Sequence, residues 1–238
     1  MLTLFLASHV PTKVGEKYLL SGDEGHHAAR VLRTEIGDQL LLSDGKGSWS
    51  RVRVLSVGKS SLDLEVMESG FQEAMGINFT VIQALPKGDR SKEAIELLTE
   101  AGADRIIPWN SARTIGKGSV EKLQVTARET SKQARRFWVP EVHEIATSAQ
   151  ILEIVREADL AIAFHESATK KLSELIIDKK AISSVVLVIG PEGGLSDEEI
   201  NALSQAGAEV CLLGRPVLRS AHAGIAAISA LNVLLGLW

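Results

Sequence analysis

The chain has 238 residues, of which 45% are hydrophobic and 24% are charged, and its formal net charge is −4. This composition is ordinary for a globular protein with one large core or two smaller ones. No apolar run approaches the roughly 20 residues that a membrane-spanning helix requires, and the opening MLTLFLASHV is too short for a signal peptide and lacks its basic flank. We therefore expect a cytoplasmic protein with no membrane segment.

Residues 1–70 are expected to form a small β barrel or sandwich. The segments RVRVLSV (51–57) and SLDLEVM (61–67) alternate polar and apolar residues, which is typical of half-buried antiparallel strands. Modules of this kind often bind RNA, although the fold alone does not establish that function. Two further β-rich runs and one helix complete the segment, at 2–7, 39–43 and 26–33.

A loss of periodicity around residues 68–76 indicates a linker, and strands and helices alternate after it. This alternation predicts a second domain, residues 77–238, with a mainly parallel sheet that helices cover on both faces. Its strands are expected at 79–85, 105–108, 160–164, 185–189 and 210–213, and its helices at 91–101, 120–136, within 145–158, at 171–178 and at 221–237.

The most informative stretch is SVVLVIGPEGGLSDEEI, residues 184–200. Its apolar run predicts a strand buried on both faces, and the glycines of GPEGG let another molecule approach the main chain closely. Ser196 and Glu199 have the spacing of a capping box for a helix that follows. A strand, a glycine turn and a capped helix are typical of a ligand site at the carboxyl end of a sheet strand, with an ordinary tight connection as the equal alternative.

A second segment, LGRPVLRSAHA (213–223), also leaves a strand and enters a helix. Free main-chain amides at the start of a helix can bind a carboxylate, a phosphate or the edge of a base. Neither segment fits a Walker loop or the spacing G-x-G-x-x-G, which excludes the two commonest nucleotide signatures. We predict that the two segments share one site.

Metal and disulfide chemistry are not expected. The single cysteine, Cys211, lies in the apolar run VCLL and is predicted to be a buried strand residue. His26 and His27 are adjacent but have no further cysteine or histidine ligands nearby in the sequence, so they make a poor metal site.

The order and identity of these motifs resemble the RsmE family of SPOUT methyltransferases, which modify uracil at N3 in 16S, small-subunit, ribosomal RNA. GPEGGLSDEEI followed by LGRPVLRSAHAGIAAISAL resembles the end of that family. HHAARVLR with DGKGSWSRVRV resembles its PUA-like β-barrel, and QALPKGDRSKEAIELLTEAGADRIIPWNSAR with ETSKQARRFWVPEV resembles the first half of its catalytic domain. The resemblance implies a trefoil knot in the mainly parallel α/β domain, S-adenosyl-L-methionine as cofactor and a homodimer.

The resemblance also implies roles for individual residues. Glu192 could receive the amine of the cofactor or cap the turn, and Arg219 could contact the target base or a phosphate, or form a structural ion pair. The expected cofactor-binding residues are Phe164, His165, Ile189, Gly190, Glu192, Gly193, Leu213, Gly214, Val217, Leu218 and Ser220.

One departure from the family pattern bears on activity. Family members often continue the Leu-Arg pair with Thr-Glu-Thr or Thr-Ser-Thr, whereas this chain has Ser220, Ala221 and His222. A neutral His222 imidazole could accept the N3 proton, with a helix-surface or dimer-interface position as the alternative reading. The same departure keeps open a non-catalytic, RNA-binding relative, and a small-molecule α/β enzyme is a third reading.

Charge is distributed unevenly, which bears on RNA binding. Residues 87–136 contain 11 Lys and Arg against 7 Asp and Glu, whereas residues 141–238 contain 7 against 13. Phosphate contacts by basic side chains would hold the RNA without reading its sequence, although such charges often only face water. Trp49 is a possible stacking residue or, alternatively, a packing residue. The candidate RNA-binding residues are Arg30, Arg33, Lys87, Arg90, Arg113, Arg135 and Arg136.

Overall fold

The computed structural model describes residues 2–238, which separate into two compact units. The first unit comprises the residues up to Ala74 together with Ser131–Val139. The second unit comprises Met75–Thr130 and Pro140–Trp238. A short segment from the middle of the chain therefore belongs to the first unit, and no pattern in the sequence indicated this.

The first unit is built on a five-stranded sheet in the order β1-β3-β4-β5-β2. All neighbouring strands are antiparallel except β1 and β3. The predicted alternation holds, because Leu62, Leu64 and Val66 of β5 are buried while Asp63 is exposed. The strands are β1 (Thr3–Leu6), β2 (Lys17–Leu20), β3 (Gln39–Ser43), β4 (Ser48–Val57) and β5 (Leu62–Phe71).

Two features of this unit differ from the expectation. Strand β2 was not predicted, since KYLL is too short to show a period. The predicted helix at 26–33 is displaced and divided into α1 (Gly22–His26) and a π-helical turn, η1 (His27–Val31). Arg33 then takes a left-handed backbone conformation, with φ 53°, which stops the helix.

The segment 131–139 packs on the sheet of the first unit. Phe137 stacks on Trp49 with ring centroids 5.6 Å apart and ring planes 10° apart. The Trp138 indole N–H donates to the carbonyl of Gln72 at 2.8 Å, and the Val139 amide donates to the carbonyl of Gly45 at 2.9 Å. Trp49 is therefore a packing residue, the alternative considered for it above.

The second unit contains a six-stranded, wholly parallel sheet in the order β11-β9-β10-β6-β7-β8. Five of these strands were predicted, and the sixth, β8, has only two residues. The strands are β6 (Asn78–Ala84), β7 (Arg105–Trp109), β8 (Glu141–Val142), β9 (Leu160–Phe164), β10 (Ser184–Ile189) and β11 (Glu209–Cys211).

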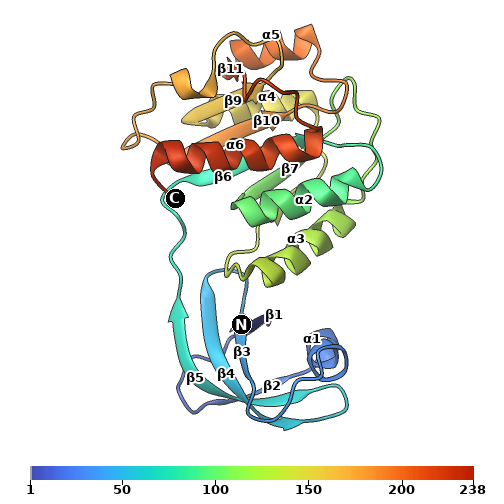
Figure 1. Cartoon of the computed structure of the whole chain (residues 1–238), viewed down its shortest axis with the longest axis vertical. Helices are drawn as coiled ribbons and strands as arrows, with labels where there is room; N and C mark the ends of the chain where they lie inside the picture. Colours follow the sequence, from blue (N-terminus) through green and yellow to red (C-terminus); the bar gives the residue numbers. More distant parts are fainter. Residues whose placement is uncertain (1) are drawn as a thin grey trace. The chain divides into compact units, whose positions relative to one another are not determined.

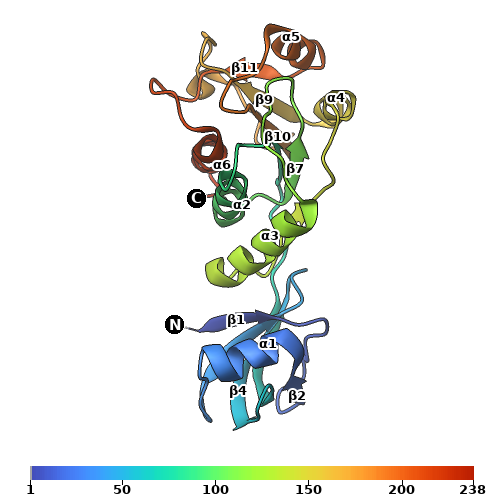
Figure 2. The ribbon, with the colours of Figure 1, turned by 90° about the vertical axis from the view of Figure 1, so that its right-hand side faces the viewer.

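Helices cover both faces of this sheet (Figures 1 and 2). One core contains residues of α2 (Arg90–Ala101), α3 (Val120–Ala134) and α6 (Ser220–Leu235). The other contains residues of α4 (Ser148–Glu157) and α5 (Asp197–Gln205). Central strand β10 serves both cores, since Val185 and Leu187 face the first whereas Val186 and Val188 face the second.

The predicted helix at 171–178 is wrong. Only a three-residue turn, η2 (Leu172–Glu174), forms there, and Leu175 is already extended. Lys171 instead makes an isolated parallel bridge with Leu212, and Ile176 is fully exposed. The apolar residues of this segment contact the core from irregular backbone. Their spacing resembles that of a helix although no helix of that length forms.

The strand order creates a place for a ligand. The chain runs from β6 outward through β7 to β8, and then crosses to β9 on the far side of β10. Ligands bind in parallel α/β sheets outside the carboxyl ends of the strands at such a reversal. The carboxyl ends of β6, β9, β10 and β11 therefore define where a site belongs. No helix within residues 2–238 is long and apolar enough to cross a membrane.

Candidate functional site

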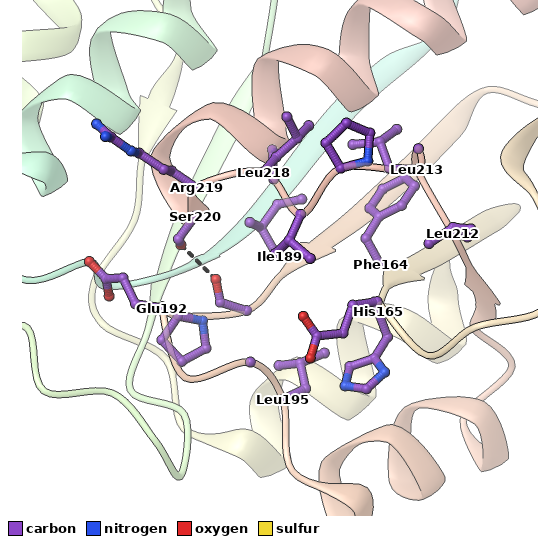
Figure 3. Close-up of a pocket in the computed structure, with 18 of the residues that line it drawn as sticks. Phe164, His165, Ile189, Glu192, Leu195, Leu212, Leu213, Leu218, Arg219 and Ser220 are labelled. Carbon is purple, nitrogen blue, oxygen red and sulfur yellow. Dashed lines mark hydrogen bonds between the residues drawn. The ribbon is translucent and has the colours of Figure 1, made fainter.

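A cavity of about 350 Å³ lies at the carboxyl ends of β9, β10 and β11 (Figure 3). Its walls are Phe164 to Glu166 after β9, the turn after β10, and the long loop from Leu212 into α6. This size falls in the usual range for small-molecule sites, roughly 300–1,000 Å³. Phe164, Ile189 and Leu213 supply apolar surface, and the loops supply main-chain amides and carbonyls.

The first wall is the GPEGG turn. Gly190 must be small, because a Cβ there would lie 3.1–3.3 Å from atoms of Leu195, and Gly194 has a φ of +71° that favours glycine. The turn leads into α5, where the Ser196 hydroxyl accepts from the Glu199 amide and the Glu199 carboxylate accepts from the Ser196 amide. The predicted capping box is confirmed, and it fixes the direction in which the chain leaves the turn.

The second wall is the loop before α6. Val217 is 74% exposed and Leu218 is 40% exposed, although both are apolar and both line the cavity. Two adjacent exposed apolar side chains at the mouth of a cavity form the kind of surface that a ligand or a partner can cover. Arg219 is the N-cap of α6 and is exposed, and its side chain extends away from Phe164 and His165 (Figure 3).

A hydrogen bond joins the two walls. The Ser220 hydroxyl donates to the carbonyl of Gly190 at 2.6 Å (Figure 3). It also accepts from the side-chain amide of Gln83 at 3.0 Å. The two segments were predicted to share one site, and this bond together with the common cavity confirms it. The hydroxyl is thus retained at the position where this chain departs from the family pattern.

Glu192 at the tip of the turn is tied to the start of α2. Its Oε1 accepts from the Lys87 amide at 3.1 Å and from the Arg90 guanidinium at 3.4 Å. Partial burial opposes ionisation, but these hydrogen bonds and the one from its own amide outweigh it and hold the pKa of Glu192 below its usual value. The carboxylate is therefore ionised at neutral pH and anchors the turn.

A second cavity of about 500 Å³ is lined by Glu192 and Gly193 of the same turn. Glu192 lines both cavities, whereas Gly193 lines only the second. Arg113 donates to the carbonyls of Gly193 and Leu195 at 2.9 and 3.3 Å, so its guanidinium is fixed against the turn. With Lys87 and Arg90, this cavity has three cationic side chains and one carboxylate.

The predicted site residues divide into three groups in the structure. Ten of the eleven expected cofactor-binding residues line the first cavity, and Gly193 lines the second. Arg219 lines the first cavity as well, and no ion pair to it is found among residues 2–238. Of the candidate RNA-binding residues, Lys87, Arg90 and Arg113 surround the second cavity, and the others lie in the first unit: Arg30, Arg33, Arg135 and Arg136.

His222 lies in the first turn of α6 but is not part of the cavity lining. Its Nε2 is 3.0 Å from Oε1 of Glu93 on α2. One ring nitrogen is therefore engaged by a carboxylate, in an arrangement that joins two helices.

Gln83 is a site residue that sequence reasoning missed. It lies in VIQAL, at the carboxyl end of a strand whose neighbours are mainly apolar. A polar side chain near the end of a buried parallel strand is the signal that could have identified it. Among residues 2–238, no group of three His, Cys, Asp or Glu side chains could hold a metal ion.

The cavity suits the group implied by the resemblance. S-adenosyl-L-methionine has an aromatic base, hydroxyl groups and a charged amino-acid tail, and the walls offer apolar side chains, main-chain donors and acceptors, and the Glu192 carboxylate. Main-chain groups of Ile189, Gly190, Leu213 and Gly214 would hold the polar edges. Leu218 and Phe164 would contact the apolar ones.

Comparisons with known proteins agree with this arrangement. The model of an RNA methyltransferase domain matches residues 73–232, and that of an RNA methyltransferase PUA domain matches residues 20–67. A ribosomal RNA small subunit methyltransferase E from Mycobacterium bovis is 36% identical, over 99% of this chain and 93% of the relative.

Two solved structures are similar along nearly the whole chain. A ribosomal RNA small subunit methyltransferase E from Neisseria gonorrhoeae, bound to S-adenosyl methionine, has a TM-score of 0.86 and 25% identity, with 98% of each chain covered. A methyltransferase structure from Legionella pneumophila, in complex with the bound cofactor SAM, has a TM-score of 0.85 and 26% identity, with the same coverage. The chain therefore belongs to the ribosomal RNA small subunit methyltransferase E family, the RsmE branch of the SPOUT RNA methyltransferases.

Proposed function

We propose that this protein transfers a methyl group from S-adenosyl-L-methionine to N3 of a uracil in 16S ribosomal RNA. The observation that carries the proposal is the cavity enclosed by the GPEGG turn and the loop before α6. The relatives named above are methyltransferases of small-subunit ribosomal RNA, and two similar structures contain this cofactor. These relationships favour the enzyme over the non-catalytic relative and the small-molecule enzyme.

The residues of this chain hold and orient the reactants. When bound, S-adenosyl-L-methionine supplies a methyl group on a positively charged sulfur. The loops that line the cavity would hold the cofactor through main-chain contacts, and Glu192 adds a negative charge at the edge of the cavity. Because Glu192 is already bonded to Lys87 and Arg90, we assign it mainly to holding the turn, as the capping alternative supposed.

The acceptor must meet the cofactor at an open edge of the cavity. The uracil N3 proton lies on the Watson–Crick edge, so the base must be unpaired or flipped out before N3 can attack the methyl in line. Loss of that proton leaves negative charge on O2 and O4, which a cation or main-chain amides can stabilise. Arg219, exposed beside the cavity, is the side chain that we assign to the base or its phosphate.

Of the two roles considered for His222, geometry favours the structural one. The imidazole is bonded to Glu93 and does not line the cavity. A His222→Ala variant would separate the two roles through the pH profile of methyl transfer. An unchanged profile is expected, and a lost or shifted acidic limb would instead identify His222 as the proton acceptor.

We assign RNA binding to both parts of the chain. The second cavity, with Lys87, Arg90 and Arg113, adjoins the cofactor cavity at Glu192 and would hold phosphates near the target base. Arg30, Arg33, Arg135 and Arg136 of the first unit would hold more distant phosphates. The functional division that we propose is a PUA-like domain at 1–70 and a methyltransferase domain at 77–238.

The proposal includes a trefoil knot around the loop before α6 and a homodimer in the cytoplasm. Support for the dimer comes from apolar residues exposed near the end of the chain, Val233, Leu234 and Trp238, and from the exposed Val217 beside the cavity. The opposite face of α6 packs in the core of its own domain through Ile228, Leu231 and Leu235.

Methyl transfer to isolated small ribosomal subunits and to naked 16S RNA tests the function. We expect label from the methyl group of S-adenosyl-L-methionine to appear as 3-methyluridine after nuclease digestion and mass spectrometry. Binding of RNA without transfer would support the non-catalytic relative. Indifference to RNA would support the small-molecule enzyme.

A further inference from the structure

Gln83 has a position that its strand alone does not explain. It is the penultimate residue of β6 and is only 3% exposed. Its Nε2 donates to the carbonyl of Ala84 at 2.9 Å and to the Ser220 hydroxyl at 3.0 Å. The residues next to it, Ile82 and Ala84, pack in an apolar core. A glutamine here thus bonds to a residue 137 positions away, at the start of α6.

The orientation of the amide is fixed by its surroundings. If the amide were turned over, Oε1 would face the carbonyl of Ala84, and two acceptors would meet. Nε2 must therefore point toward Ala84 and Ser220. Since the Ser220 hydroxyl accepts from Nε2, its single proton is directed at Gly190, to which it donates at 2.6 Å.

The result is a relay of two hydrogen bonds from β6 to the cofactor cavity. It begins at a buried amide, passes through the hydroxyl of Ser220, a residue that is 6% exposed, and ends at the first carbonyl of the GPEGG turn. Hydrogen bonds in series polarise one another, and they are strengthened where water is excluded. Each wall of the cavity is thereby held by the same side chain.

The side-chain oxygen of Gln83 shows that this arrangement has a free-energy cost. Oε1 of Gln83 is buried and has no hydrogen-bond partner within residues 2–238, and a Cβ added to Gly224 of α6 would lie 3.7 Å from it. A buried acceptor without a partner costs free energy, which offsets part of what the two Nε2 hydrogen bonds contribute to stability. The link that these bonds make to the start of α6 therefore accounts for the glutamine better than stability does.

We propose that Gln83 is a positioning residue for cofactor binding, acting through Ser220 on the carbonyl of Gly190. This inference rests on the proposed function, because it assumes that the cavity holds S-adenosyl-L-methionine. Ser220 contributes by aligning the two walls, and its hydroxyl proton is committed to Gly190 and is not offered to the ligand. The family departure after Arg219 leaves this relay intact.

The test is a double-mutant cycle on the affinity for S-adenosyl-L-methionine, measured by titration calorimetry on the full chain. Gln83→Leu and Ser220→Ala should each weaken binding about tenfold, the effect of one hydrogen bond. The double variant should be no weaker than Ser220→Ala alone, because both changes break the same relay. The melting temperature of Gln83→Leu should stay close to the wild-type value, because the variant loses the unpaired acceptor together with the two Nε2 hydrogen bonds.

Thr80→Val is the matched control. Thr80 is a buried polar residue of the same strand, and within residues 2–238 its hydroxyl bonds only to the side chain of Asn78. Its affinity for the cofactor should equal that of the wild type. An unchanged affinity in Gln83→Leu, or a roughly hundredfold, additive loss in the double variant, would overturn the relay. A wild-type protein that does not bind the cofactor would refute the proposed function instead.

Discussion

Arg135 combines a strained backbone with a side chain that we propose binds RNA. It follows the last residue of α3 with φ 52°, and its amide bonds to the carbonyl of Lys132 at 3.2 Å. Residues that end a helix in the left-handed region are usually glycine, since a Cβ there costs about 1–2 kcal/mol. The strain at Arg135 therefore has no local compensation from the residue type, and the proposed contact with RNA gives the arginine a function there.

We predict that Arg135→Gly raises stability and lowers RNA affinity. Relief of strain should add about 1 kcal/mol to the free energy of unfolding in urea. Loss of one phosphate contact should reduce the slope of log affinity against log salt by about 1. Arg135→Lys, which keeps both the charge and the strain, should change neither quantity much. A glycine variant with unaltered RNA affinity would remove Arg135 from the RNA surface.

At the level of single residues, the sequence predicted the residues that line the cavity better than the residues that hold them in place. Residues such as Ile189, Gly214 and Leu218 belong to short motifs, so their neighbours in the chain reveal them. The partners of Glu192 and Ser220, namely Lys87 and Gln83, are separated from them by more than 100 positions. Only the folded sheet brings these pairs together, which is why local patterns could not predict them.

Among the elements, the junction between β9 and β10 depends on one carboxylate. Asp159 accepts from the amide and hydroxyl of Ser183 and from the hydroxyl and amide of Ser184, at 2.8–2.9 Å. These bonds lower the pKa of Asp159 from 3.8 to about 2. They hold the starts of two parallel strands whose other ends form the cavity.

The pKa shift predicts a pH-dependent contribution to stability. Because the folded-state pKa is lowered, the stabilisation is fully present above pH 3.8 and is lost as the pH falls through about 2. Asp159→Asn should therefore destabilise the protein at pH 7, and the difference from the wild type should narrow in urea unfolding near pH 3. An equal difference at both pH values would contradict this account.

The segment 131–139 is an element that packs away from its neighbours in sequence. Gly47 permits this packing: it has φ +98°, and a Cβ there would lie 2.7 Å from the carbonyl of Gln72 and 2.8 Å from the Trp138 ring. Its amide also donates to the carbonyl of Phe137 at 2.9 Å. Position 47 thus requires glycine, both because its φ is positive and because there is no room for a Cβ.

Gly47→Ala should lower the free energy of unfolding by at least about 2 kcal/mol, since strain and a main-chain clash combine. Gly15→Ala is the control, because Gly15 has φ +83° but nothing within 4 Å of an added Cβ. That variant should show only the smaller cost of strain in the same urea titration. Equal losses in the two variants would mean that the contact with residues 137–139 contributes little.

Regular elements were predictable where the sequence pattern was distinct, as for helix α2 and for strand β10, which is buried on both faces. Prediction from the sequence failed where the structure depends on residues that are distant in the chain. Lys171 is paired with Leu212 by an isolated bridge, and β8 pairs with Arg105 and Ile106 of β7. The packing of 131–139 within the first unit has no local signature.

For the whole molecule, the proposed homodimer makes a prediction about mass in solution. Val233 on α6 is 64% exposed, and replacing it with Asp would place a charge in an apolar interface. The wild type should sediment at twice the 25.6 kDa chain mass, and Val233→Asp should shift toward the monomer. Val125→Asp, at a valine of α3 that is 59% exposed, should remain dimeric. A monomeric wild type would refute the dimer.

The central claim is that the two walls tied by Ser220 enclose S-adenosyl-L-methionine, and calorimetric titration with that compound tests it most directly. Ala223 lines the cavity from α6, so Ala223→Phe should fill it, whereas Ala149→Phe makes the same change at an exposed position of α4. We predict that the wild type and Ala149→Phe bind alike, with one site per chain, and that Ala223→Phe does not bind. Equal binding by all three proteins would place the cofactor elsewhere and contradict the account.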